Sequence, residues 1–389
     1  MRRFRVRTEK GDYPAVVGCG AWGELRGLVD RGYSSIFVLT EKRIWNRWAE
    51  EFGRESGLQA ARVVLVPSGE KSKSLAEAER VAGTLLKQGA DRRSLLVLFG
   101  GGVVGDLGGF VASTYMRGID CVQVPTTVVG QVDSAVGGKT AVNVGAMKNL
   151  VGTFYPPRMV LADPRVLGSL GSRIFRSGLY EVVKHAILDG SAFFERLERE
   201  LGSLVPANAP KLEGILGQAV KVKVDVVNRD EREHSLRQVL NLGHTFGHAL
   251  EEVTGYRRFL HGEAVGWGLL AVTLLAERLG YLKSQAAPQG RAANAASEDQ
   301  GSPESAGDRS DGERIRRLVW RIGPLPPIRN VSSRTIIRLL PHDKKAVGGE
   351  IRWVIPERIG KVRIVAGIPL AEARAVWKEL QQQTSAADY

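Results

Sequence analysis

The sequence predicts an α/β domain with a mostly parallel, Rossmann-like sheet, followed by an all-α domain. Short apolar runs alternate with helical segments over residues 1–164, which is typical of parallel strands joined by helices. One of these runs leads directly into a glycine-rich turn. From residue 165 to residue 389, long helical periodicity replaces the strands. We therefore expect a domain boundary near Asp163 and Pro164.

Four apolar runs of the first domain predict buried strands, because each is short and bounded by residues that favour turns. They are Ile36–Leu39, Val63–Pro67, Leu95–Phe99 and Cys121–Pro125. A helix is expected over Ser74–Leu86, since Ser74 can cap it and Glu77 follows at the spacing of a capping box.

Long helices are expected in the second domain, where apolar residues recur at helical spacing. They cover Gly178–Leu188, Lys211–Asn228 and Gly262–Leu279. Residues 283–312 differ, because they contain no Val, Ile, Phe, Trp or Tyr. Such a segment buries too little apolar surface to offset its ordering entropy, so we expect a disordered insertion there.

Bulk composition favours a cytoplasmic enzyme over a membrane or nucleic-acid-binding protein. No stretch is long and apolar enough to span a bilayer, and the basic start lacks the apolar core of a signal peptide. Cys19 and Cys121 lie far apart, which indicates reduced thiols. The formal net charge of +13 comes from scattered basic residues without interleaved aromatics. We interpret it as an Arg-rich surface with an anion-binding pocket.

The glycine-rich turn predicts a dinucleotide site. Gly100, Gly102 and Gly105 fit the pattern G-x-G-x-x-G, with a strand before them and a helix expected at about Leu107–Met116. Such glycines let the backbone approach a pyrophosphate at a helix N-terminus. The alternative is a packing turn without a ligand. The usual ribose-binding acid has no clear match, since Asp120 lies just before a strand, so the nucleotide would be held differently.

A second glycine motif resembles the end of a phosphate-binding P-loop but does not complete it. In Val136–Thr140 the pattern is present, but Asp133 occupies the position of the first required glycine. We therefore exclude a P-loop NTPase. Lys139, Lys148 and Arg117 remain candidates for phosphate contacts as donors and point charges.

Histidines and one glutamate predict a metal site. His244 and His248 are four residues apart on one helix face, and His261 opens the next helix. Together with Glu181, they suit a catalytic zinc ion with an open position. Spacing leaves open which three groups ligate, and His244 with His248 is one possible pair. Thr245 stands where a protease of this type has its base. A hydrogen-bonded core histidine is the alternative for any single imidazole.

Further charged residues surround these candidates. Lys184 and His185 share a helix face with Glu181. Glu233, Arg237, Asn241 and His244 follow spacings of four, four and three residues. This spacing predicts that one face of a single helix carries all four.

These segments together resemble the 3-dehydroquinate synthase family. The matching stretches occur in one order, cover most of the chain and are highly specific as a set. They are 68–73, 100–118, 125–127, 131–143, 147–157, 175–185, 230–233, 240–251, 261–265 and 343–345.

The resemblance implies a role for each matching residue. The metal ligands would be Glu181, His244 and His261, with His248 as an acid/base group and Glu233 as a second proton acceptor. The NAD contacts would be Glu41, Glu70, Lys73, Gly101, Gly102, Val103, Asp106, Thr126, Thr127 and Lys148, with Ser169 on the adenosine side. The substrate contacts would be Arg117, Asp133, Lys139, Asn149, Lys184, Lys223, Arg237, Asn241 and one of Lys344 and Lys345.

The implied activity converts 3-deoxy-D-arabino-heptulosonate 7-phosphate into 3-dehydroquinate and phosphate. The implied cofactors are NAD and one divalent metal ion, zinc or cobalt. A transient oxidation by NAD acidifies a neighbouring C–H, phosphate leaves, the hydride returns, and ring opening precedes an intramolecular aldol closure. Arg237 with Lys223 suits the carboxylate, and Lys139 with Arg117 suits the phosphate. A homodimer without nucleic-acid or membrane partners is expected.

Three other functions were weighed against this one. Another sugar-phosphate cyclase, of aminocyclitol or valiolone type, would not need Arg237 and Lys223, because its substrate lacks the carboxylate. A metal-dependent polyol dehydrogenase would release NADH and need no phosphate-binding lysines. A basic nucleic-acid-binding protein would not explain Glu181 together with the histidines.

Overall fold

The computed structural model describes residues 1–145, 147–282, 309–340 and 350–386. The chain forms two compact units, which are described separately. The first comprises residues 1–185 and 199–240, and the second comprises residues 186–198 and 241–389. This division is not the one expected at residue 164, and whether residues 1–164 form an independent domain stays a prediction. Most of the expected disordered insertion, and both Lys344 and Lys345, lie outside the described residues.

The first unit is built on a seven-stranded sheet of order β1-β2-β9-β6-β5-β3-β4. Its strands are β1 (Arg2–Val6), β2 (Tyr13–Val17), β3 (Ile36–Glu41), β4 (Arg62–Val66), β5 (Leu95–Gly100), β6 (Asp120–Pro125) and β9 (Met159–Ala162). All neighbours pair in parallel except β1 with β2. The four predicted strands are confirmed as β3, β4, β5 and β6, with ends shifted by at most two residues.

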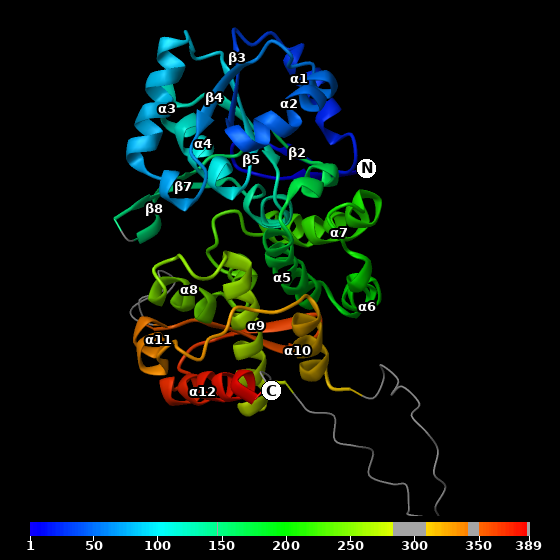
Figure 1. Ribbon diagram of the computed structural model, residues 1–389, viewed down its shortest axis with the longest axis vertical. Coiled ribbons are helices and arrows are strands. Elements are labelled where there is room, and N and C mark those ends of the chain that lie inside the picture. Colours follow the sequence, from blue (N-terminus) through cyan, green and yellow to red (C-terminus); the bar gives the residue numbers. More distant parts are fainter. Residues whose placement is uncertain (146, 283–308, 341–349, 387–389) are drawn as a thin grey trace, which may run out of the picture. The chain divides into compact units, whose positions relative to one another are not determined.

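Helices cover both faces of this sheet (Figure 1). On one face, α3 (Leu75–Lys87) and α4 (Gly102–Thr114) bury Leu96 and Leu98 of β5. On the other face, Phe99 stacks on Phe52 of α2 (Lys42–Ser56), with ring centroids 4.4 Å apart. Because β5 is buried on both faces, its sequence is continuously apolar and does not alternate. The predicted cap of α3 is also confirmed, since the backbone N–H of Glu77 donates to Ser74 Oγ at 3.2 Å.

The remaining elements of the first unit carry several predicted site residues. The helices are α1 (Arg26–Val29), α5 (Ser172–Asp189) and α7 (Ala209–Val227), and the strands β7 (Lys139–Val144) and β8 (Met147–Phe154) form a hairpin. Short helical turns connect the elements; they are η1 (Ala21–Leu25), η2 (Glu70–Ser72), η3 (Tyr115–Arg117), η4 (Gly130–Ser134), η5 (Pro164–Ser169), η6 (Leu201–Ser203) and η7 (Leu236–Asn241). Among the predicted helices, the first two of the second domain correspond to α5 and α7.

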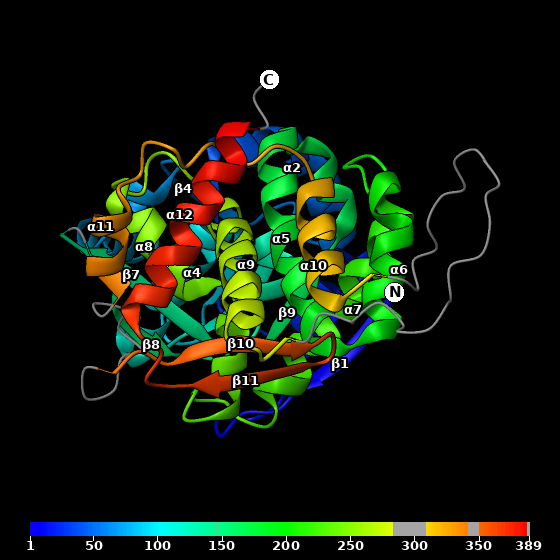
Figure 2. The ribbon, with the colours of Figure 1, turned by 90° about the horizontal axis from the view of Figure 1, so that it is seen from below.

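The second unit is organised around α9 (His261–Arg278), whose side chains are buried from Gly262 to Ala276. Figure 2 shows α9 between α10 (Asp311–Arg321) and α12 (Leu370–Ala386). The unit also contains α6 (Ser191–Glu200), α8 (His244–Val253) and α11 (Ser333–Leu339). The region is mainly helical, as predicted, but it is not all-α. An antiparallel hairpin of β10 (Trp353–Arg358) and β11 (Lys361–Val365) packs against α9.

Glycines bring α8 and α9 unusually close together. A Cβ added at Gly268 would lie 1.8 Å from the carbonyl oxygen of Gly243, and one at Gly247 would lie 3.1 Å from the carbonyl oxygen of Ala264. Any larger residue at Gly268 would force the two segments apart. The glycines of the second unit therefore fix the distance between the helices that carry the histidines.

None of the helices in the described ranges combines the length and the apolar character that crossing a membrane requires.

Candidate functional site

The predicted NAD contacts gather at the carboxyl edge of the first unit's sheet. Most of them lie at or after the end of a parallel strand, since Glu41 ends β3, Glu70 follows β4 and Thr126 follows β6, whereas Lys148 lies on β8. Gly101, Gly102, Val103 and Asp106 follow β5, Thr127 follows β6, and Ser169 follows β9. The chain order along the sheet reverses between β3 and β5. Ligands of open α/β sheets bind outside the carboxyl ends of the strands at such a reversal.

The glycine-rich turn joins β5 to α4, but the helix begins at Gly102, five residues earlier than predicted. A Cβ at Gly100 would lie 2.5 Å from the Val104 side chain, and one at Gly105 would lie 2.7 Å from Gln123 Oε1 on β6. Both glycines are thus required for packing, which was the alternative explanation of the motif. Gly101 is the N-cap and has no capping side chain, so the first N–H groups of α4 are available to an anion.

A polar network connects this turn to the β7–β8 hairpin. The buried ammonium of Lys73 pairs with Asp106 on α4 and donates to Asn149 on β8. Asn143 completes the network, since its Nδ2 donates to Glu70 at 2.9 Å and its Oδ1 accepts from the Asn149 backbone N–H at 2.9 Å. Sequence reasoning missed Asn143, although it closes one of the matching stretches. Predicted cofactor contacts and a predicted substrate contact therefore share one network.

Three other predicted NAD contacts are held by their neighbours. Ser169 Oγ accepts a hydrogen bond of 3.1 Å from the indole N–H of Trp48, and Glu41 accepts one from Ser68. Thr127 Oγ1 accepts from the backbone N–H of Gly130 at 3.0 Å. These bonds fix the side chains at the ends of their strands.

Three predicted substrate or proton-transfer residues have left-handed backbone. Arg117, Asn149 and Glu233 have φ values of 68°, 53° and 62°. Only two other non-glycine residues in the described part of the chain have positive φ, Met116 and Tyr256. Such conformations are uncommon for these residue types and concentrate where function requires a fixed side chain.

A buried group of charges forms the centre of the first unit's site. Asp133 on η4 lies 2.5 Å from the Lys223 ammonium on α7 and 3.8 Å from the Lys184 ammonium on α5. Lys184 also pairs with Glu181, one turn earlier on α5. Glu181, Lys184 and His185 are almost completely buried. The structure thus brings four predicted residues of this unit together, from three separate elements.

Burial and mutual attraction set the protonation states in this group. Burial would raise the pKa of Asp133, but Lys184 and Lys223 hold it well below its ordinary value. Burial lowers the pKa of Lys223 to about 8, although Asp133 opposes this change. Burial, together with Lys184, lowers the pKa of His185 to about 3, so this imidazole is neutral near pH 7. The group thus keeps two lysines buried beside their carboxylate partners, where an acidic substrate could pair with them.

Arg237 is also buried, and the loop before it is folded by Asp230. The Asp230 carboxylate accepts backbone N–H groups from His234, Ser235 and Arg237 at 2.8–2.9 Å. Arg237 Nη2 donates to the carbonyl of Gly137 at 3.3 Å, and a Cβ at Gly137 would lie 2.3 Å from that nitrogen. Sequence reasoning missed Asp230 as the organiser of this loop.

The sequence predicted a single helix that carries Glu233, Arg237, Asn241 and His244. That prediction was wrong. Glu233 lies in the loop, Arg237 and Asn241 lie on η7, and α8 begins only at His244. The left-handed backbone at Glu233 interrupts any helix there, because the Asp230 cap favours a turn. In this position Glu233 pairs with Lys139 of β7.

The second unit brings three histidines together. The ring centroids of His244 lie 5.3 Å from those of both His248 and His261, and His248 lies 6.2 Å from His261. His261 opens α9, as predicted. His244 Nδ1 lies 3.1 Å from the carbonyl oxygen of Leu242, and His261 Nδ1 lies 3.1 Å from Glu251 Oε2. Since a carbonyl oxygen and an ionised carboxylate only accept, these contacts favour the tautomer of each imidazole with its proton on Nδ1.

The two units differ in how well their side chains could bind a metal cation. In the first unit, Asp133, Glu181 and His185 offer ligand atoms within 4.8 Å of one another. Lys184 and Lys223 both face Asp133 there, which disfavours that carboxylate as a ligand of a further cation. In the second unit, the nitrogen atoms of three clustered imidazoles suit a zinc-type ion. The ligand set Glu181, His244 and His261 stays a prediction.

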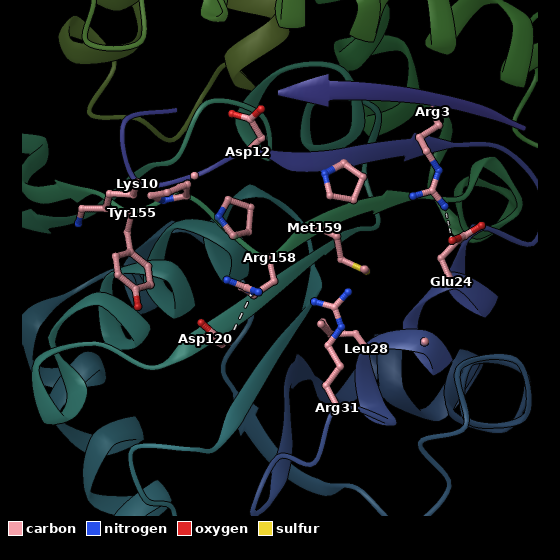
Figure 3. Close-up of a pocket in the computed structure, with 15 residues that line it drawn as sticks. Arg3, Lys10, Asp12, Glu24, Leu28, Arg31, Asp120, Tyr155, Arg158 and Met159 are labelled. Atoms are coloured by element: carbon pink, nitrogen blue, oxygen red, sulfur yellow. Dashed lines mark hydrogen bonds and ion pairs between the residues drawn. The ribbon is translucent and has the colours of Figure 1, made fainter. Parts of the chain in front are cut away.

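The first unit also has a pocket unrelated to the predicted site residues (Figure 3). Asp120 and Met159, which line it, are the first residues of β6 and β9. The pocket therefore lies at the amino end of the parallel strands, opposite the edge that carries the predicted NAD contacts. Its basic lining residues include Arg3, Lys10, Arg31 and Arg158.

Comparisons with known proteins match nearly the whole chain. Residues 63–177 match the family model described as 3-dehydroquinate synthase N-terminal, and residues 178–305 match the one described as 3-dehydroquinate synthase C-terminal. The 3-dehydroquinate synthase of Solibacter usitatus (strain Ellin6076) is 36% identical over 368 residues. That match covers 95% of this chain and 96% of the relative.

Solved structures with the same fold include two synthases. One is 2-deoxy-scyllo-inosose synthase complexed with carbaglucose-6-phosphate, NAD+ and Co2+, with a TM-score of 0.78, 22% identity, and coverage of 98% of this chain and 99% of that one. The other is 2-epi-5-epi-valiolone synthase from Streptomyces hygroscopicus subsp. jinggangensis 5008 with NAD+ and Zn2+ bound. Its TM-score is 0.79, its identity is 24%, and coverage is 98% of this chain and all of that one.

Proposed function

Since the chain belongs to the 3-dehydroquinate synthase family, we propose that it converts 3-deoxy-D-arabino-heptulosonate 7-phosphate into 3-dehydroquinate and inorganic phosphate. The observation that carries this proposal is the match over 95% of the chain to a 3-dehydroquinate synthase. The buried Lys223 and Arg237 agree with it, because they suit a carboxylate that the substrates of other sugar-phosphate cyclases lack.

We propose NAD and one divalent metal ion, zinc or cobalt, as cofactors. When bound, NAD supplies a reversible hydride acceptor, and the metal ion supplies Lewis-acid stabilisation of negative charge on oxygen. Two cyclases of the same fold hold NAD+ with Co2+ or Zn2+, which supports both assignments. The carboxyl edge of the sheet suits the nucleotide, and the glycine-rich turn suits its pyrophosphate.

For the metal, we propose His244 and His261 as imidazole ligands and Glu181 as the carboxylate ligand. The Nδ1 contacts of both histidines leave Nε2 directed to other partners, as a metal ligand requires. Glu181 is completely buried and pairs with Lys184, so its carboxylate is already ionised and shielded from water. One carboxylate with two imidazoles is a recurrent catalytic zinc set with an open position.

Charged residues of the first unit would position the substrate. Lys223 and Arg237 would hold its carboxylate, since both are buried cations with few competing waters. Lys139 and Arg117 would hold its phosphate. Asp133 would keep Lys223 oriented and charged before the substrate arrives, because it pairs with that ammonium at 2.5 Å. The remaining substrate contacts proposed are Lys184, Asn149, Asn241 and one of Lys344 and Lys345, the last two outside the described residues.

Two groups would move protons. His248 is an imidazole that can give and take a proton near neutral pH. Glu233 pairs with Lys139 and is therefore ionised, as a proton acceptor must be. When the substrate phosphate also attracts Lys139, Glu233 would gain freedom to accept a proton.

The protein is proposed to act in the cytoplasm as a homodimer without nucleic-acid or membrane partners. The scattered distribution of basic residues supports this view, since nucleic-acid-binding surfaces concentrate their charge.

The test measures phosphate release from 3-deoxy-D-arabino-heptulosonate 7-phosphate by the purified full chain with and without a chelator. The proposal predicts release that the chelator abolishes and that Zn2+ or Co2+ restores. Glucose 6-phosphate, which lacks the carboxylate, serves as the competing substrate. Faster turnover of glucose 6-phosphate than of the heptulosonate phosphate would instead identify a different sugar-phosphate cyclase.

A further inference from the structure

Glu251 is a buried carboxylate beside a proposed metal ligand, and the proposed function gives it no role. It lies on α8, three residues after His248 and seven after His244, so all three occupy one helix face. Its side chain is 4% exposed, and its Oε2 lies 3.1 Å from Nδ1 of His261. The next residue, Glu252, is exposed on the same helix.

A carboxylate at this position determines the tautomer of His261. An ionised carboxylate has no proton to donate, so the nitrogen that faces it must carry the hydrogen. The lone pair of the ring then lies on Nε2, on the opposite side of the imidazole. The negative charge also makes that nitrogen a stronger base and therefore a better metal ligand.

His244 is held in the same way, but its hydrogen-bond partner is an uncharged oxygen. Its Nδ1 faces the carbonyl oxygen of Leu242 at 3.1 Å. Both imidazoles are thus held by an oxygen behind Nδ1, one from the backbone and one from a charged side chain. A buried carboxylate is costly to desolvate, whereas a backbone carbonyl adds no such cost, so Glu251 needs a specific compensating interaction.

We propose that Glu251 is a positioning residue of the metal centre, which fixes the ring orientation and the Nδ1–H tautomer of His261. The proposal rests on the proposed function in taking His261 as a ligand. It differs from a role of Glu251 as a ligand itself. That role must be tested, because His248, Glu251 and His261 also offer ligand atoms within 4.8 Å of one another.

The experiment measures Co2+ affinity by competition with a chromophoric chelator, together with the visible absorption spectrum of the Co2+-loaded full chain. Glu251→Gln keeps the size of the side chain and removes its charge. Glu251→Ala also removes the acceptor. Glu252→Gln is the matched control, since it removes a neighbouring exposed charge from the same helix.

The expected result is Co2+ binding about tenfold weaker in Glu251→Gln and up to about 100-fold weaker in Glu251→Ala, with no change in Glu252→Gln. The Co2+ bands should shift while their intensity shows an unchanged coordination number. Thermal unfolding of the metal-free variants checks that they fold. If Glu251→Ala does not fold, the Co2+ affinity of Glu251→Gln alone tests the proposal.

Two results would overturn the proposal. Unchanged Co2+ affinity in both Glu251 variants would mean that Glu251 does not act on His261. A loss in Glu251→Gln as large as that in His261→Ala, with a changed coordination number, would make Glu251 a ligand. Failure of the proposed function is distinguishable, because the wild-type chain itself would then bind no Co2+ or would bind it equally well without His261.

Discussion

The two units prepare their side chains for chemistry by different physical means. In the first unit, Asp133, Lys184 and Lys223 hold one another through charge, and their burial makes those interactions strong. In the second unit, clustered imidazoles are held by hydrogen bonds to oxygen and by helices that glycines bring close together. Buried lysine ammonium groups suit an anionic substrate, whereas imidazole nitrogens suit a metal cation. The comparison teaches that each unit offers side chains suited to a different kind of ligand.

The largest effect is expected from removing a proposed metal ligand. His261→Ala should lose bound metal and lower kcat/KM by at least about 10³-fold, because the Lewis acid goes with the ligand. Metal content by elemental analysis and phosphate release by a coupled assay check both losses. His234→Ala is the control, since His234 is exposed and its backbone N–H, which the substitution keeps, donates to Asp230. Retention of full metal content in His261→Ala would remove that residue from the ligand set.

A smaller effect is expected from removing a cation of the charged group. Lys223→Met should lower kcat/KM by about 10²-fold, since a buried hydrogen bond to a charged group contributes about 1.5–3 kcal/mol. It should leave metal content unchanged, which would separate the functions of the two units. Lys221→Met is the matched control on the same helix, because Lys221 is half exposed and its ion pair with Asp225 lies at the surface. Equal activity losses in the two variants would contradict the role of Lys223.

The pH dependence of kcat/KM should follow the ionisation of Lys223. Lys223 faces Asp133, with Arg237 and Lys184 nearby, and its pKa is about 8. It is charged below this pH and neutral above it, so anion binding is lost as the pH rises. We expect kcat/KM to fall above about pH 8, approaching tenfold per pH unit. Lys223→Met should lack this descending limb. A limb that persists unchanged in the variant would assign it to another group.

The smallest effect concerns stability and the glycines of the second unit. Gly268→Ala should lower the free energy of unfolding by about 1–3 kcal/mol, because the new Cβ would lie 1.8 Å from the Gly243 carbonyl oxygen. It should also weaken metal binding by moving α9. Gly83→Ala on α3 meets no atom within 4 Å and should be neutral or stabilising by about 0.4–1 kcal/mol. Urea unfolding of both variants measures the difference, and equal values would contradict the close packing.

Much of the fold could be predicted because its central strands are apolar on both faces. The run Leu95–Phe99 and the capping pair of Ser74 and Glu77 carry local signals that tertiary structure preserves. Strands β1 and β7 carry no such signal. β1 reads Arg-Arg-Phe-Arg-Val, and its outward side chains are basic, so only pairing with β2 makes it a strand.

Local sequence patterns also failed to predict parts of the site, because contacts with other segments fold them. The spacing from Glu233 to His244 fits a helix, yet Asp230 folds those residues into a turn through three backbone hydrogen bonds. Spacing cannot reveal such a cap, because Asp is equally common on solvated surfaces. Glu251 could have been found, since it continues the face of His244 and His248 at helical spacing. Asn143 could not, because its partner Glu70 lies 73 residues away in the sequence.

The most direct test follows phosphate release and NADH absorbance in the same sample during turnover of 3-deoxy-D-arabino-heptulosonate 7-phosphate. If the hydride returns within each cycle, phosphate accumulates steadily while NADH never exceeds the concentration of enzyme. NADH that rises mole for mole with substrate consumption would contradict a transient oxidation and identify a dehydrogenase.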